Sequence, residues 1–144
     1  MRAVVRAADG RDPPTRLTQD LLGFLGLLDH RDLVPFVAGA TKGQVGALAP
    51  LVLMAAEEGD PASRSIVDLG LKALGQYLEA VRGQWKPSGT PFPLALAGGL
   101  LEKDGLLRNP LLAMASRKGA ETSPDPAIPV RGAARLALEL ARVS

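Results

Sequence analysis

The sequence predicts an α/β fold that is mostly helical and has few strands. One apolar run, Pro93–Leu100, lacks polar alternation, which is typical of a strand covered on both faces, as in parallel sheets. The stretches before and after this run carry apolar residues at helical spacing. With 144 residues, of which 47% are hydrophobic, the chain is large enough to bury a core and suits a single domain.

Charge and cysteine content exclude several classes of protein. The net charge is only +2, and none of the few aromatic residues lies in a basic cluster, so a nucleic-acid surface is not expected. The absence of cysteine excludes disulfides and thiolate metal sites and fits a reducing compartment. No apolar run approaches membrane length, and no apolar leader follows Met1. We therefore expect a cytoplasmic protein without a nucleic-acid or membrane partner.

The first part of the chain is predicted to be helical. Residues 2–8 look like the end of a helix whose beginning is missing. Thr18 is expected to cap a second helix, with Leu17 and Leu22 placed for a hydrophobic staple. The aspartates beside the only histidine, His30, are interpreted as caps of a short helix rather than as a charge cluster.

Capping signals also delimit the helices in the middle of the chain. Thr41 and Gln44 fit a capping box, and Pro50 is expected to bend or interrupt the helix that follows. Asp60, with a proline directly after it, suits the N-cap of a helix of about six turns that ends at Gly83.

Within this long helix, one apolar stripe is expected to face the interior. It consists of Ile66, Gly70, Leu74, Tyr77 and Val81, flanked by Val67, Leu71 and Leu78. Two glycines, Gly70 and Gly75, lower the intrinsic helix propensity by about 1 kcal/mol each. Close packing against a neighbouring element would explain both glycines.

The last third combines the apolar strand with two helices. A helix is expected over residues 106–118, with Gly119 as its left-handed end. The pattern also allows a short strand at Ala120–Thr122. A final helix begins near Pro129, and its small residues Gly132–Ala134 permit close approach of a neighbouring element.

The glycine pair at the end of the apolar strand has two interpretations. Gly98 and Gly99 allow a sharp turn and leave room for a ligand to approach the backbone. In open α/β sheets, ligands bind beyond the carboxyl ends of the strands. Judged on these residues alone, a plain tight turn is the favoured interpretation.

Four stretches, in this order and spacing, carry a resemblance to a known family. They are Arg2–Arg11 with Leu17-Thr18, Leu48–Pro50 through Gly59–Ala62 and Ile66, Leu94–Leu101, and Pro129–Ala134 with Leu136-Ala137. The chain resembles the C-terminal portion of the N-acetylglucosamine kinase / BadF-type ATPase family, within the actin–hexokinase–Hsp70 superfamily. The resemblance spans nearly the whole chain.

The resemblance implies part of a ribonuclease H-like, actin-like ATPase second lobe. Residues 1–58 would be a helical insertion, and residues 60–144 a helix–strand–Gly-Gly–helix–strand–helix segment of the same single domain. In that family Mg-ATP lies between two lobes, and a strand–Gly-Gly–helix element holds the adenosine. The matching residues here are Gly98, Gly99 and Leu100, which the resemblance assigns to ATP binding.

The resemblance also implies what this chain lacks. Neither an Asp-Gly-Gly-x-Thr-like nor a Gly-Thr-Gly-Ser-like phosphate loop occurs in the sequence, and the Gly-Asp-Glu-Gly-Ser segment of the family is absent. No catalytic residue and no metal ligand is therefore assigned, and the chain alone is not expected to transfer phosphate. The sequence leaves two hypotheses besides a bland helical domain. One is a kinase-like half that needs a complementary N-terminal half, and the other is a non-enzymatic, kinase-derived module that self-associates as a homodimer.

Overall fold

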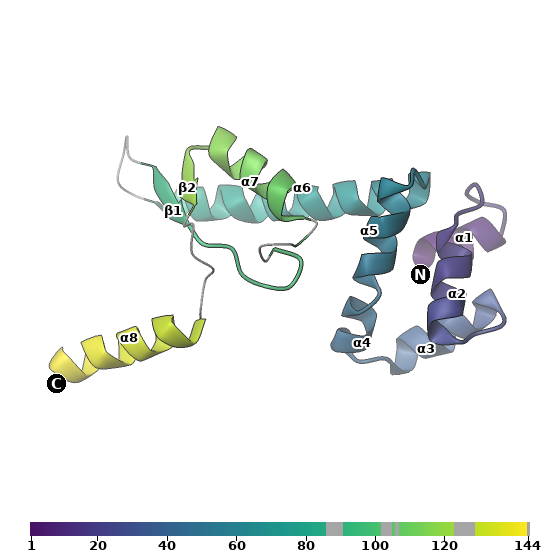
Figure 1. The fold of residues 1–144 in the computed structure, drawn as a ribbon, viewed down its shortest axis with the longest axis horizontal. Coiled ribbons are helices and arrows are strands. Elements are labelled where there is room, and N and C mark those ends of the chain that lie inside the picture. The colour runs from purple at the N-terminus through teal and green to yellow at the C-terminus, as the bar shows by residue number, and fades with distance from the viewer. Residues whose placement is uncertain (86–90, 102–104, 106, 123–128, 144) are drawn as a thin grey trace. The chain divides into compact units, whose positions relative to one another are not determined.

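The computed structural model describes residues 1–85, 91–101, 105, 107–122 and 129–143, the last helix partly by its backbone alone (Figure 1). The chain divides into two compact units, Met1–Gly70 and Leu71–Ser144, and each is described by itself. The described part of the chain is mostly helical and contains one pair of parallel strands. The ribonuclease H-like fold and the single domain with an insertion over residues 1–58 remain predictions.

The first unit consists of short helices and the beginning of one long helix. In chain order these are α1 (Arg2–Ala8), α2 (Leu17–Leu25), the 3-10 turn η1 (His30–Asp32), α3 (Leu33–Gly39), α4 (Lys42–Gly46), α5 (Ala49–Glu57) and the first turns of α6 (Pro61–Gln84). Helix α6 continues into the second unit.

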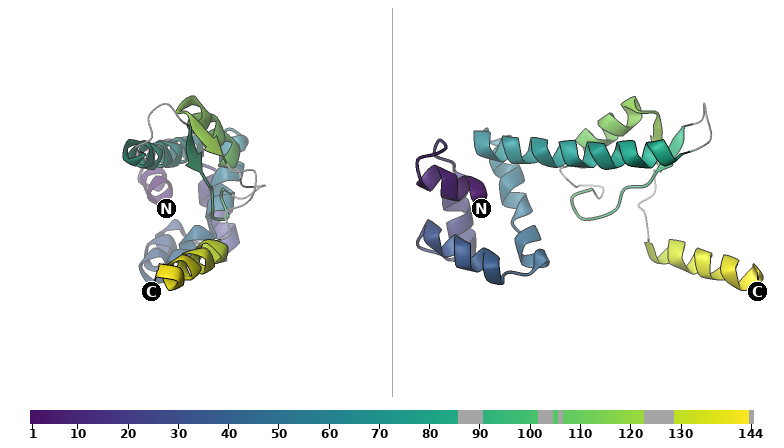
Figure 2. Two further views of the ribbon diagram at one scale, coloured as in Figure 1. Left: turned by 90° about the vertical axis from the view of Figure 1, so that its left-hand side faces the viewer. Right: turned by 180° about the vertical axis from the view of Figure 1, so that it is seen from behind.

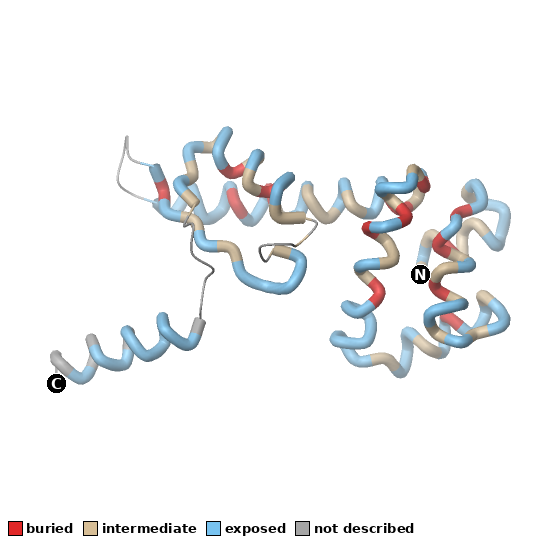
Figure 3. The backbone as a smooth tube through the Cα atoms, in the orientation of Figure 1, coloured by how far each residue is buried: buried red, intermediate tan, exposed pale blue. Residues whose placement is uncertain are grey.

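Apolar side chains from most of these helices form one core in the first unit. The buried members are Val4, Leu17, Leu21, Leu33, Leu48 and Ala55. Figure 3 draws the buried positions of the chain in red. Such a cluster, drawn from segments far apart in the sequence, holds together helices that are too short to be stable alone.

The predicted caps are confirmed in part. The Asp29 carboxylate accepts a hydrogen bond from the Arg31 backbone N–H at 2.8 Å and so caps η1, whereas Asp32, the N-cap residue of the predicted helix α3, makes no capping hydrogen bond with its side chain. Thr41 and Gln44 form the predicted capping box of α4. Pro50 lies in the first turn of α5, where a proline is tolerated, and α4 ends before it.

The predicted N-cap at Thr18 is wrong. Helix α2 begins at Leu17, and Arg16 is its N-cap residue without a capping side chain of its own. The backbone N–H of Arg16 donates instead to the Asp60 carboxylate at 3.1 Å, and that of Leu17 donates to the Thr15 hydroxyl at 3.3 Å. A carboxylate 44 residues away in the sequence therefore takes the role that we had given to a local side chain.

The second unit contains a strand–helix–strand segment and a final helix. Its elements are the end of α6, β1 (Phe92–Leu94), α7 (Arg108–Arg117), β2 (Ala120–Thr122) and α8 (Pro129–Val143). The two strands are parallel, with Phe92 opposite Ala120 and Leu94 opposite Thr122. The structure confirms α7, the left-handed Gly119 and the short second strand. The first strand is shorter than predicted and ends at Leu94.

A small apolar core joins α6, α7 and the strands. Leu78, Phe92 and Ala115 are buried together, with Met114 among the partly buried side chains around them. Figure 2 shows α7 and the strands beside α6 from two further directions. A Cβ built at Gly75 would lie 2.8 Å from the Met114 sulfur, so this glycine allows close packing as predicted. At Gly70 the same test meets no atom within 4 Å, so the structure gives no such explanation for that glycine.

The prediction of the inward-facing stripe of α6 is wrong in part. Tyr77 is 71% exposed and Val81 50% exposed, whereas Leu78 from the predicted flank is buried. The apolar residues of α6 occupy more of the helix circumference than its neighbours contact. Helix α7 and strand β1 pack on the side of α6 that carries Leu78. The other apolar side of the helix therefore faces solvent. In α8 the described side chains, Val130 and Leu138 among them, are also exposed.

Candidate active site and its relatives

The sequence-predicted binding residues lie together in one turn after β1. The backbone N–H of Leu101 donates to the carbonyl oxygen of Gly98 at 2.7 Å, which closes the turn around Gly99 and Leu100. Gly98 has φ +103°, a conformation that side chains with a Cβ rarely adopt. The turn is anchored further by Arg108 of α7, whose guanidinium donates to the Leu101 carbonyl at 2.7 Å.

The space beside this turn is open. Beyond its chain neighbours, a Cβ built at Gly98 or at Gly99 meets no atom within 4 Å in the part of the chain that the structure describes, and Leu100 is 40% exposed. Gly99, unlike Gly98, does not have a left-handed conformation. The structure thus explains Gly98 by backbone geometry, whereas the second glycine leaves room that a flat ligand could occupy. This arrangement fits either interpretation of the glycine pair, a plain turn or a ligand site.

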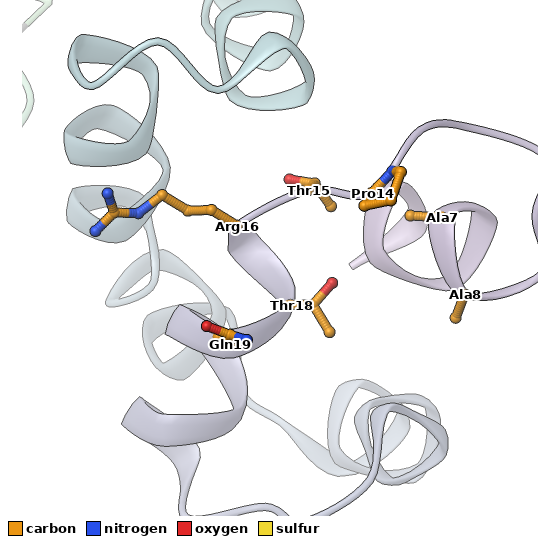
Figure 4. A pocket seen from close by; sticks show the side chains of 7 residues that line it. All are labelled: Ala7, Ala8, Pro14, Thr15, Arg16, Thr18 and Gln19. Atoms are coloured by element: carbon orange, nitrogen blue, oxygen red, sulfur yellow. The ribbon is translucent and has the colours of Figure 1, made fainter.

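One groove of about 450 Å³ lies between the end of α1 and the start of α2 (Figure 4). Its polar lining includes Thr15, Arg16, Thr18 and Gln19. The Arg16 guanidinium pairs with Asp20 at 2.9 Å and also with Glu58. None of its lining side chains is a carboxylate, a histidine or a lysine, so the groove offers no acid–base pair for catalysis.

A second groove, of about 700 Å³, is lined by α1, the segment after it and the first turns of α6. The Arg6 guanidinium in its wall binds the Asp12 carboxylate with two hydrogen bonds of 2.7 and 2.8 Å. These hydrogen bonds hold the pKa of Asp12 below its ordinary value and raise that of Arg6. Apolar residues such as Ile66 and Leu69 form the rest of the wall. Arg6 and Asp12 therefore neutralise each other in the wall of this groove.

The most strongly bonded polar group of the first unit is the Asp60 carboxylate. It is buried and accepts hydrogen bonds from the Thr15 hydroxyl at 2.9 and 3.0 Å, from the backbone N–H of Arg16, and from the Ser63 hydroxyl and backbone N–H at 2.7 and 2.8 Å. Burial alone would raise the pKa of Asp60, but the donors from Ser63, Thr15 and Arg16 together lower it. One carboxylate thus caps both α6 and α2.

The hydrogen bonds of Asp60 have a structural role, and the sequence predicted only those at the start of α6. The sequence predicted Asp60 as the N-cap of α6, and the bond from the Ser63 N–H confirms that prediction. The bond from Thr15 could not be found by spacing, because 45 residues separate the two side chains. The donors are hydroxyl and backbone N–H groups next to the starts of α2 and α6, so the carboxylate serves to cap these two helices.

Two features are absent from the described part of the chain. Among the residues that the structure describes, no group of three or more histidine, cysteine, aspartate or glutamate side chains could hold a metal ion. Nor does any helix within the described ranges have the length and apolar character needed to cross a membrane.

Comparison with known proteins relates the chain to one class of enzyme. It is 34% identical to the N-acetyl-D-glucosamine kinase of Dictyostelium discoideum over 149 aligned positions, which cover 96% of this chain and 45% of that enzyme. It is 29% identical to the N-acetylmuramic acid/N-acetylglucosamine kinase of Clostridium acetobutylicum over 103 positions, covering 70% of this chain and 34% of that enzyme. The chain is similar to sugar kinases.

The similarity covers only part of each related enzyme. The chain spans between a third and a half of the length of the curated relatives that it matches. No family model matches the sequence, and no solved structure is significantly similar to it. The similarity therefore supports a relation to sugar kinases, while the activity of the whole enzymes belongs to the proposals that follow.

Proposed function

We propose that this chain is part of a sugar-kinase-like ATPase and contributes the adenosine side of its ATP site. The observation that carries the proposal is the β1–Gly98-Gly99–α7 segment, in a chain similar to N-acetylglucosamine kinases. The glycine turn lies beyond the carboxyl end of a parallel strand, where ligands bind in α/β sheets. Membership in the BadF-type ATPases, the ribonuclease H-like fold and a cytoplasmic location are parts of the same proposal.

The residues of the turn fit an adenosine better than a phosphate group. Gly98 and Gly99 present backbone without a Cβ, so the flat face of a base or a ribose could lie against them. Leu100, partly exposed, offers an apolar side chain for the same face. The Arg108 guanidinium already donates to the Leu101 carbonyl. Bound Mg-ATP would supply the phosphoryl group, and these residues would only orient its adenosine.

The phosphates and the metal ion require groups that the described residues do not assemble. Phosphoryl transfer depends on positioning and on neutralising charge around the phosphates. Within the described ranges no cluster of metal-ligating side chains exists, and the sequence contains no phosphate loop of the family's kind. We therefore propose that the chain is inactive alone and acts together with a complementary half that carries those loops.

Calorimetric titration with Mg-ATP tests this proposal, and Gly99→Val is the diagnostic variant. A Cβ at Gly99 meets no atom within 4 Å among the described residues beyond its chain neighbours, so valine should leave the fold intact while it fills the space proposed for the adenosine. Gly23→Val is the matched control, because Gly23 in α2 is equally open. We expect micromolar to low-millimolar binding by the wild type and the control and none by Gly99→Val. Equal affinity of all three proteins would refute the site.

A second candidate function is a non-enzymatic module that self-associates. The observation that favours it is the exposure of apolar side chains in the second unit, including Tyr77, Val130 and Leu138. Light scattering on the purified chain separates the two candidates. A stable homodimer that does not bind Mg-ATP would favour the module, and nucleotide binding by a monomer would favour the kinase-like half.

A further inference from the structure

The turn beyond β1 has two different sides. Gly98, Gly99 and Leu100 are exposed, whereas Leu101 at the end of the turn is half-buried. The carbonyl group of Leu101 is bonded to the start of α7, and the carbonyl oxygen of Leu100 accepts a hydrogen bond from the Leu107 backbone N–H at 3.3 Å. The turn is therefore fixed to α7 through two consecutive carbonyl groups, while its glycines stay accessible.

Arg108, the first residue of α7, makes two contacts that join the helix to the turn. Its guanidinium Nη1 donates to the Leu101 carbonyl oxygen at 2.7 Å, and its backbone N–H donates to the carbonyl oxygen of Gly105 at 2.9 Å. A hydrogen bond from a charged donor is stronger than one between neutral groups. Arg108 is half-buried, so its bond to the turn is partly shielded from water. One residue thus holds the turn and Gly105 in a single arrangement.

Gly105 lies directly against the backbone of the turn. A Cβ built there would lie 2.4 Å from the Leu100 carbonyl oxygen and 2.8 Å from the Leu101 nitrogen, both shorter than an ordinary contact. Gly105 does not have a left-handed conformation, so its own backbone geometry does not require glycine. The close approach to Leu100 does require it, because the obstacle is backbone and a side chain would displace the turn.

An arginine at the start of α7 is unfavourable for the helix itself. The N-terminus of a helix carries a partial positive charge, which favours acidic residues there and repels cations. The first turn of α7 contains no acidic residue, and no side chain caps it. A residue that opposes the local preference of its helix is expected where it serves another purpose. For Arg108 the bond to the Leu101 carbonyl indicates what that purpose is.

This anchoring matters for a ligand that lies against backbone. A flexible segment has to be ordered when a ligand binds to it, and the ordering weakens the affinity. The bonds of Arg108 and the close contact of Gly105 order the turn before any ligand arrives. Since α7 engages the carbonyl groups of Leu100 and Leu101, a ligand meets the exposed side of the turn, where the two glycines lie.

We propose that Arg108 and Gly105 are positioning residues of the nucleotide site, which hold the turn in the shape that adenosine meets. The inference rests on the proposed function and adds to it two residues that do not touch the nucleotide. Arg108 acts through the Leu101 carbonyl, and Gly105 acts through the space that it leaves for Leu100. The competing role for Arg108 is a direct contact with phosphate, since a guanidinium has further N–H donors.

The test compares adenosine with Mg-ATP as ligands of the full chain, in NMR and calorimetric titrations. Arg108→Ala removes the bond to the turn, and Arg117→Ala is its control, because Arg117 is exposed in the last turn of the same helix. Gly105→Ala introduces the clash. Gly83→Ala is its control, because beyond its own helix a Cβ at Gly83 meets no atom within 4 Å among the described residues. Circular dichroism of each purified chain establishes which variants fold.

We expect both diagnostic variants to bind adenosine and Mg-ATP about tenfold more weakly than the wild type, by the same factor for the two ligands. The controls should bind as the wild type does. In the free protein, the Leu101 amide hydrogen, which closes the turn on Gly98, should exchange with water faster in Arg108→Ala, while the amides of α6 keep their rates. If Gly105→Ala does not fold, Arg108→Ala decides alone.

Three results would overturn the inference. Unchanged affinity of Arg108→Ala for both ligands would overturn it while leaving the proposed function in place. A loss confined to Mg-ATP would make Arg108 a phosphate contact, and faster exchange throughout the second unit would give it a role in stability alone. A wild type that binds neither ligand would refute the proposed function, and the inference with it, so the two failures are distinguishable.

Discussion

The two units of this molecule differ in how completely they bury their interiors. The first unit combines a cluster of six buried apolar residues with a buried carboxylate whose bonds are all made within the unit. Among the residues that the structure describes in the second unit, three are buried together, and apolar residues on one side of α6 are exposed. The two units have similar lengths, but their described residues are buried to different extents.

From this difference we expect the first unit to be stable alone and the second unit to associate with another surface. In the first unit, every buried polar side-chain atom has a hydrogen-bond partner, which favours stability without a partner protein. A parallel strand pair with helices on one face is an incomplete form of a layered α/β sheet. We expect mutations in the first unit to act on folding and those on the exposed side of the second unit to act on association.

The largest effect is expected from Asp60→Ala in the first unit. The substitution leaves the Thr15 hydroxyl and the N–H groups of Arg16 and Ser63 without their acceptor in a buried place. A loss of about 3 kcal/mol in the free energy of unfolding follows from the usual penalty for buried unsatisfied donors. Urea unfolding followed by circular dichroism measures it. Asp20→Ala, which removes a partner of the exposed Arg16, should change stability by less than about 0.5 kcal/mol; equal losses would contradict the role given to Asp60.

Acid should weaken the first unit through the same carboxylate. The folded state lowers the pKa of Asp60, so its contribution is fully present above the unfolded value of about 4. It is lost as the pH falls through the lower folded value. The urea midpoint of the wild type should therefore fall between pH 5 and pH 3 more steeply than that of Asp60→Asn, which has no carboxyl to protonate. Parallel pH curves for the two proteins would show that Asp60 is not the group responsible.

Smaller changes in stability are expected from substitutions at two glycines of α6, one in each unit. Gly70→Ala adds a methyl group that meets no atom, and it should stabilise the protein by about 1 kcal/mol through helix propensity. Gly75→Ala gains the same propensity but places its methyl 2.8 Å from the Met114 sulfur, so its net gain should be smaller. Thermal unfolding ranks the two variants. A larger gain for Gly75→Ala would mean that α7 does not pack on α6 as described.

The smallest effect is expected from Glu79→Gln in the second unit. Lys118 donates a hydrogen bond to the Glu79 carboxylate, and this bond holds the pKa of Glu79 below its ordinary value. The pair is largely exposed, so water and salt screen it, and the urea midpoint should not change measurably. A clear destabilisation that disappears at high salt would reveal a stronger link between α6 and α7 than this surface pair suggests.

Local chemistry was predictable from the sequence, and long-range chemistry was not. The capping box at Thr41, the proline break at Pro50 and the left-handed Gly119 depend on neighbours within a few residues, and all three are present. The prediction that Thr18 caps α2 failed because the carboxylate that accepts the hydrogen bond at the start of this helix belongs to Asp60, which is far away in the sequence. Hydrophobic spacing likewise showed that α6 is amphipathic but could not show which apolar side meets α7.

At the candidate site, too, only the local geometry was predictable from the sequence. The sequence pattern placed a sharp turn at Gly98-Gly99, and the structure contains a turn closed by the Leu101 N–H. The strand before the turn is shorter than the apolar run suggested, since apolar residues continue beyond Leu94 without a pairing partner. Neither the sequence nor the fold assigns a ligand to the turn, because backbone freedom at glycine serves a bend and a binding surface equally.

The contact between Thr15 and Asp60 also has a consequence for the rate of folding. Its two ends are 45 residues apart, so it forms only after most of the first unit has been brought together. Local contacts such as the Thr41 capping box can form much earlier. We therefore expect Asp60 to contribute little to the folding transition state and much to the lifetime of the native state. In stopped-flow experiments, Asp60→Ala should speed unfolding while refolding stays close to the wild-type rate.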